Sequence, residues 1–161
     1  MRACAGWIHR HWWFKWSQKI GRSGGGNLPR LTFRVVEEYA PSTSGIEVPV
    51  VLGVGSRRIA LAAKVDTGAT SCIFQRAYAE MLGLRMDDGQ PQWFSTATGS
   101  FEARGHFVTL SSMEHVVDSL VFFAVDEGFS RNVLGLGGWL EKVRFGLVHY
   151  DRRIYLSHYD D

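Results

Sequence analysis

The stretch Lys64-Val65-Asp66-Thr67-Gly68-Ala69-Thr70 places a carboxylate in a turn directly after an apolar segment. Residues 59–65 predict a largely buried strand, and residues 73–84 predict an apolar helix-like segment. An Asp between two such segments is unusual, because Asp is rarely buried without a partner. Gly68 permits the close approach of another backbone. Asp-Thr-Gly is also a common turn composition, so these three residues alone favour an ordinary hairpin turn.

A second motif downstream reverses that preference. Val65-Asp66-Thr67-Gly68-Ala69 resembles the active-site signature of the retropepsin-like aspartic proteases, and Asn132-Val133-Leu134-Gly135 resembles the family's apolar-apolar-Gly element before a short helix. The resemblance covers roughly residues 46–156, and the two motifs occur in the family's order. It implies an all-β, closed-barrel-like acid protease fold with one or two short helices and one Asp-Thr-Gly lobe per chain.

The rest of the pattern is predominantly β. Runs rich in β-branched and aromatic residues predict strands at 31–39, 46–54, 57–65, 93–96, 101–110, 116–125, 132–136, 145–150 and 153–157. Apolar residues recur at helical spacing from Phe74 to Leu82, and Gly83 followed by Leu84 predicts a left-handed cap at the end of that helix. A second short helix is predicted over residues 138–142.

Charge divides the chain into two parts. Of the 18 Lys and Arg residues, seven lie within residues 1–34, which contain no Asp or Glu. Residues 35–161 contain the other 11 together with all 16 acidic residues. We therefore expect a basic, Trp-rich N-terminal extension with a Gly-rich linker over residues 1–30, and a protease-like domain over residues 31–161. The domain is not basic, which argues against nucleic acid as a partner.

Residues 7–20 hold four of the six tryptophans together with several basic and histidine side chains. One interpretation is a weak membrane-surface contact, with Trp at the headgroup level and Lys and Arg facing anionic lipid. The other is an extension outside the fold, or translated sequence upstream of the true start. The second is favoured, because the apolar residues do not fall on one helical face.

The two cysteines, Cys4 and Cys72, lie in different regions and do not form a disulfide framework, which favours a cytoplasmic location, with peripheral membrane contact as the variant. Cys72 lies in an apolar run and is expected to be a buried small side chain. No Cys or carboxylate joins the scattered histidines at metal-ligand spacing, so neither a metal nor another cofactor is expected.

The catalytic hypothesis follows from the count of Asp-Thr-Gly motifs. Two carboxylates about 3 Å apart share one proton, so that one serves as base while the other serves as acid. This chain has a single copy of the motif, at Asp66. If the chain is an aspartic endopeptidase acting on peptides or proteins, Asp66 must meet Asp66 of a second subunit across a two-fold axis, which predicts a homodimer.

The resemblance also implies roles for neighbouring residues. Thr67 would brace the partner's loop, Gly68 and Ala69 would complete the active-site loop beside the substrate strand, and Val133, Leu134 and Gly135 would form the second motif. A flap hairpin is expected over residues 93–101, with its tip at Ala97, Thr98 and Gly99. Small polar residues flanked by aromatics suit a mobile cover.

One departure from the family concerns Thr70 and Leu136. Retroviral members carry an acidic residue and an Arg at these positions, and the two pair with each other. Both are missing here, which favours a cellular rather than a retroviral type and predicts that apolar packing holds the loop instead. The alternative function is a retropepsin-like dimerisation or peptide-binding domain without catalysis; the intact Asp-Thr-Gly favours the enzyme.

Overall fold

The computed structural model describes residues 30–160, apart from residues 41 and 98. The aromatic and basic stretch 7–20 and the linker after it lie outside the described residues. The described strands are β1 (Val35–Glu38), β2 (Glu47–Val54), β3 (Arg57–Val65), β4 (Ile73–Phe74), β5 (Gln90–Thr96), β6 (Gly99–Ser112), β7 (His115–Ala124), β8 (Val133–Leu134), β9 (Val143–Val148) and β10 (Arg153–His158). The helical segments are α2 (Arg76–Leu82) and the 3₁₀ turns η1 (Met86–Asp88) and η2 (Leu140–Lys142).

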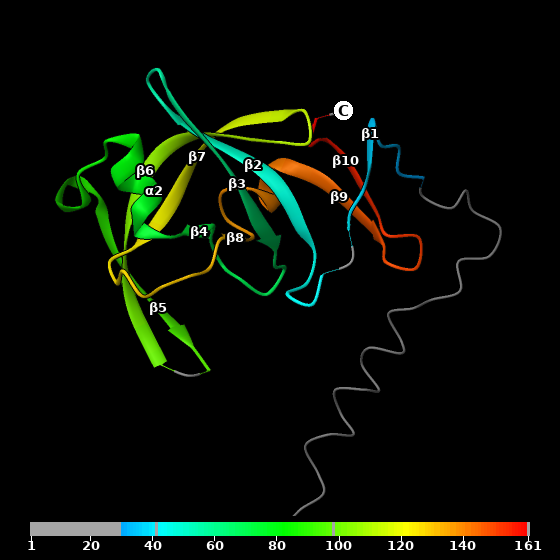
Figure 1. Cartoon of the computed structure of the whole chain (residues 1–161). Helices are drawn as coiled ribbons and strands as arrows, with labels where there is room; N and C mark the ends of the chain where they lie inside the picture. The colour runs from blue at the N-terminus through cyan, green and yellow to red at the C-terminus, as the bar shows by residue number, and fades with distance from the viewer. Residues whose placement is uncertain (1–29, 41, 98, 161) are drawn as a thin grey trace, which may run out of the picture. The chain divides into compact units, whose positions relative to one another are not determined.

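Seven strands form one sheet in the order β2-β3-β8-β4-β7-β6-β5, and an additional pairing of β2 with β6 closes it into a ring (Figure 1). The long strand β6 makes this closure possible, because its C-terminal half pairs with both β7 and β2 while its N-terminal half pairs with β5. The β5–β6 hairpin therefore extends beyond the ring (Figure 1). The predicted all-β, closed-barrel-like architecture with short helices is confirmed.

A smaller antiparallel sheet, in the order β1-β10-β9, joins the two ends of the described domain. Its inner face contributes Ile154 and Leu156, both essentially inaccessible, to the main core. The segment before β1 continues the contact, because the Arg34 amide donates to the Leu156 carbonyl at 3.0 Å and to the Ser157 hydroxyl at 2.9 Å. The N-terminal strand is thus held by the last one.

The barrel interior is filled by alternate side chains of its strands, as expected for a sheet that faces its own core. Its largest fully buried side chains are Trp139, Phe74, Phe123, Leu52 and Leu110. A second, smaller apolar cluster forms on the outer face of β6 and β7 around Ile73, Ala103 and Phe122. This outer cluster lies against a pocket that Asp66 also lines.

Most predicted elements agree with the structure, and the differences have local causes. The strand over 57–65 has the predicted bounds, and Gly83 caps α2 with φ of 76°. The helix predicted over 138–142 is only the 3₁₀ turn η2, because Gly138 at φ of 94° cannot continue a right-handed helix. The strand predicted over 132–136 is limited to β8, since its pairing with β3 spans two residues.

Candidate active site

Asp66 directly follows β3, where the chain leaves the barrel. Its amide donates to the Leu134 carbonyl at 3.0 Å, which extends the parallel pairing of β3 with β8 by one residue. The amide of Val65, the residue before it, donates to the Ile46 carbonyl at 2.8 Å on the other side. The backbone that carries the Asp66 side chain is therefore held from two directions, and the side chain itself is half-buried.

The Asp-Thr-Gly turn is closed by its own carboxylate. Oδ1 of Asp66 accepts a hydrogen bond from the Gly68 amide at 2.9 Å, and the Ala69 amide donates to the Asp66 carbonyl at 3.1 Å. This is an Asx-type turn, in which the side chain replaces a main-chain acceptor. Thr67 and Gly68 are exposed at the end of the turn. One carboxylate oxygen is thus fixed by the loop, and Asp66 lines the pocket described next.

The second motif lies against this loop, and Gly135 is the reason that it can. A Cβ at Gly135 would lie 2.3 Å from the Ser71 carbonyl oxygen and 2.9 Å from that of Ala69, distances that no side chain tolerates. The Leu136 amide donates to the Ala69 carbonyl at 2.9 Å across this contact. The structure therefore brings the two sequence motifs together, with main chain against main chain.

The loop is not held by the apolar packing that the sequence predicted at Thr70 and Leu136. Thr70 is exposed, and Leu136 is 47% exposed. The Gly137 amide donates to the Thr70 carbonyl at 2.9 Å, and the Cys72 amide donates to the Gly137 carbonyl at 3.0 Å. Main-chain hydrogen bonds, and not the side chains of Thr70 and Leu136, hold the loop at these positions. The expectation of apolar packing there was wrong.

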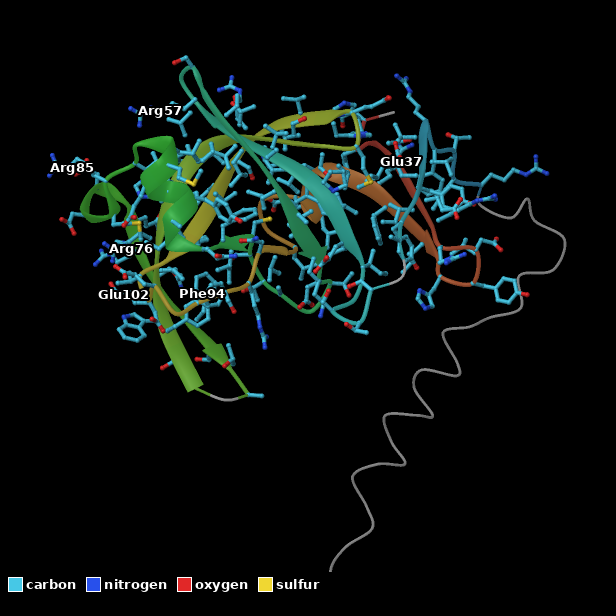
Figure 2. The ribbon with its side chains drawn as sticks, in the orientation of Figure 1. Glu37, Arg57, Arg76, Arg85, Phe94 and Glu102 are labelled. Carbon is cyan, nitrogen blue, oxygen red and sulfur yellow. The ribbon has the colours of Figure 1, made fainter. Side chains whose placement is uncertain are left out.

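A pocket of about 380 Å³ opens beside Asp66. Apolar side chains dominate its wall: Ile73, Phe94, Phe101, Phe129 and Val133. The rings form a connected set, with Phe94 and Phe101 stacked at 5.6 Å and Phe101 tilted against Phe129 at 4.8 Å between centroids. Figure 2 labels Phe94 on β5, in the hairpin that extends from the ring. The polar lining comes from Asp66, Thr70, Ser95, Thr96 and Arg131.

The hairpin predicted as a flap is formed by β5 and β6, with register Phe94↔Phe101 and Thr96↔Gly99. Thr96 Oγ1 donates to the Gly99 carbonyl at 3.0 Å, which closes the hairpin below its tip. Ala97 and Gly99 are exposed, and Thr98 lies outside the described residues. The strand residues Phe94, Ser95 and Thr96 line the pocket of Asp66, whereas Ala97 and Gly99 line a second pocket of about 450 Å³.

Sequence reasoning missed two residues of this site, Phe129 and Arg131, which both line the pocket. They lie in the irregular segment between β7 and β8, where no periodic pattern marks a residue as inward-facing. Their only signal is their position just before the Asn132-Val133-Leu134-Gly135 motif.

Cys72 lies beneath the loop and is fully buried, as predicted. Burial raises the pKa of its thiol to about 12, although its hydrogen bond from the Gly135 amide, at 3.4 Å, opposes the shift. A thiol with this pKa is not a nucleophile near neutral pH. Within the described residues no group of three or more His, Cys, Asp or Glu side chains is placed to hold a metal ion, and no helix is long and apolar enough to span a membrane.

A barrel that presents a single Asp-Thr-Gly loop at an apolar pocket next to a hairpin defines the class of retropepsin-like aspartic protease folds. A family model described as aspartyl protease matches residues 48–137, more than half of the chain, and the chain belongs to that family. At the level of the family, the chain is an aspartyl protease domain.

One solved structure agrees with this chain at the level of the fold, and a second is similar over a shorter part of the chain. A retropepsin-like aspartic protease from Rickettsia conorii is 17% identical, with a TM-score of 0.54 over 76% of this chain and 98% of that chain. The EIAV protease in complex with the inhibitor HBY-793 is 18% identical, with a TM-score of 0.45 over 56% of this chain and 80% of that chain. No curated protein matches the sequence significantly.

Proposed function

We propose that the protein is an aspartic endopeptidase whose catalytic dyad consists of Asp66 from each of two subunits. The observation that carries the proposal is the setting of Asp66: a half-buried carboxylate with one oxygen fixed by the Gly68 amide, at the wall of an apolar pocket. Thr67 would brace the partner's loop, and Gly68 and Ala69 would lie along the substrate strand. The β5–β6 hairpin would close over the bound peptide.

The need for a second subunit follows from the lining of the pocket. Asp66 is the single carboxylate among the described residues that line it. One carboxylate cannot act as base and acid in the same step, because its proton is either bound or absent. A second copy related by a two-fold axis would bring an identical Asp66 to the same place.

The chemistry then needs no other group. The unprotonated carboxylate takes a proton from water as the water oxygen bonds to the peptide carbonyl carbon, and the protonated carboxylate gives its proton to the carbonyl oxygen. The resulting tetrahedral diol collapses when the C–N bond breaks. The leaving nitrogen accepts a proton from the protonated carboxylate, and a diol hydroxyl gives its proton to the other carboxylate. The dyad thus returns to its starting state with one proton shared.

The first test is cleavage of a randomised peptide library by the wild type and by Asp66→Asn, from about pH 3 to pH 8. The wild type is expected to cleave with a bell-shaped or acid-shifted profile, because one member of the dyad must be protonated and the other ionised. Asn is nearly isosteric but cannot exchange the proton, so the variant is expected to be inactive. Equal activity of the two proteins would refute the aspartic mechanism.

The second test addresses the shared dyad. Wild type and Asp66→Asn are unfolded together and refolded at several ratios with the total concentration fixed. If both subunits must supply Asp66, a mixed dimer is inactive, and activity falls as the square of the wild-type fraction, to about a quarter at equal amounts. A linear fall would show that each subunit works alone. Peptide binding without any cleavage would instead identify a non-catalytic peptide-binding or dimerisation domain.

A further inference from the structure

Arg131 is the one cationic side chain among the described residues that line the pocket of Asp66. It also lines the neighbouring pocket, together with Ala97 and Gly99 of the hairpin. The contact between Phe101 and Phe129 separates the two hollows, since both rings belong to both linings. A peptide strand that runs from Asp66 towards the hairpin tip would therefore pass the Arg131 guanidinium.

The backbone of Arg131 is fixed on both sides by residues that reach other strands. The Gln75 side chain donates to the Ser130 carbonyl and to Oδ1 of Asn132, each at 3.4 Å. Nδ2 of Asn132 donates to the Ala62 carbonyl at 3.2 Å. The main-chain carbonyl of Asn132 accepts from the Lys64 amide at 2.9 Å. Arg131 thus projects from an anchored segment, although it is exposed itself.

The Arg131 guanidinium has no partner in the part of the chain that the structure describes. Among the described residues no hydrogen bond or ion pair engages the Arg131 side chain. Asp126 lines the neighbouring pocket with Arg131 and accepts from the Gly128 amide at 2.9 Å, and Glu127 lies 3.9 Å from Nε of Arg76. Neither carboxylate forms an ion pair with Arg131 among the described residues. Arg76 is labelled on α2 in Figure 2. A positive charge at an apolar pocket without an internal counter-ion is available to a ligand.

We propose that Arg131 is a specificity-determining residue that selects peptides with a glutamate side chain in the pocket beside Asp66, an inference that rests on the proposed function. The two methylenes of glutamate pack against Phe94, Phe101 and Phe129, and its carboxylate meets the planar donor fork of Arg131. Arg131 is exposed, so the apolar wall shields the ion pair from water on one side only. The two carboxylates of the proposed dyad interact with each other, so the Arg131 guanidinium is left to pair with a carboxylate of the substrate.

The experiment compares matched peptides. The best substrate of the randomised library is resynthesised with Glu, Gln or Lys at each position around the cleaved bond, and kcat/KM is measured for wild type, Arg131→Ala and Arg131→Glu. At one position the wild type is expected to prefer Glu over Gln by roughly tenfold, the usual effect of a charge-assisted hydrogen bond. Arg131→Ala should lose this preference, and Arg131→Glu should prefer Lys at the same position.

Arg58→Ala is the control, because Arg58 is exposed on the β2–β3 hairpin and lines neither pocket, yet the variant loses the same unit of charge. It should keep the preference for Glu. An unchanged ratio in Arg131→Ala, or a wild type that ignores the change from Glu to Gln at every position, would overturn the proposal.

A binding readout separates this proposal from the proposed function. The same library is passed over immobilised Asp66→Asn protein and over the double variant Asp66→Asn, Arg131→Ala. Enrichment of Glu on the first and not on the second supports the role of Arg131 even where the wild type cleaves nothing, an outcome that would refute catalysis alone. Absence of Glu enrichment on the first protein would refute the specificity while cleavage stands or falls separately.

Discussion

Replacement of Gly135 by Ala is expected to destabilise the protein severely, although it adds one methyl group. The new Cβ would lie 2.3 Å from the Ser71 carbonyl oxygen, about 1 Å closer than van der Waals contact allows. Because the obstacle is main chain, it cannot rotate away as a side chain would. Overpacking of this kind costs about 1–3 kcal/mol.

Relief of the clash would also stretch the hydrogen bonds that join the loop to the second motif. The Leu136 amide to Ala69 carbonyl bond and the Gly137 amide to Thr70 carbonyl bond are both 2.9 Å long. Each such bond contributes about 1 kcal/mol. The total loss is therefore about 3–5 kcal/mol, which for a domain of this size lowers Tm by roughly 10–20 °C.

Thermal unfolding followed by circular dichroism measures this loss, and Gly128→Ala is the matched control. Its Cβ would meet only the Asp126 side chain, at 3.2 Å at the closest, so Tm should change by no more than a few degrees. The Gly135→Ala protein should also lose peptide cleavage below its new Tm, since the displaced loop carries Asp66. A Tm within about 3 °C of the wild type would refute the argument from close approach.

Three further predictions concern other parts of the chain. Cys72 is fully buried and its thiol pKa is about 12. It should resist iodoacetamide at about pH 8 in the native protein and react after denaturation, as measured by peptide mapping. Rapid alkylation of the native protein would contradict its burial. Burial lowers the pKa of His106 below its ordinary 6.5, against the field of Asp88, so protonation favours the unfolded chain and stability should fall as the pH drops below about 6.5. The His106→Phe variant should show a shallower fall of Tm over that range, and identical pH profiles would exclude the effect. Removal of residues 1–30 should leave peptide cleavage and co-sedimentation with anionic vesicles unchanged, whereas loss of vesicle binding would support a membrane contact through residues 7–20.

The sequence was sufficient for the strands and the loop but not for what holds them together. Strand β3 could be predicted to the residue because an apolar run ends at a turn on each side. The left-handed cap at Gly83 followed from a glycine after helical spacing. The requirement for Gly135 could not be derived from local pattern, because it arises from a carbonyl 64 residues earlier in the chain. Arg131 was missed because it lies in the irregular segment between β7 and β8, where no periodic pattern indicates which residues face a pocket.

The failed expectation at Thr70 and Leu136 shows what kind of interaction fixes the site. Side chains at positions 70 and 136 would be needed to hold the loop only if backbone hydrogen bonds did not already hold it. Here the amides of Leu136 and Gly137 donate to the carbonyls of Ala69 and Thr70, and the close approach at Gly135 makes that geometry available. Main-chain bonds of this kind do not depend on which side chains occupy positions 70 and 136. The position of Asp66 therefore depends on the backbone of the two motifs, and the side chain of Leu136, 47% exposed beside the loop, is not needed to hold it.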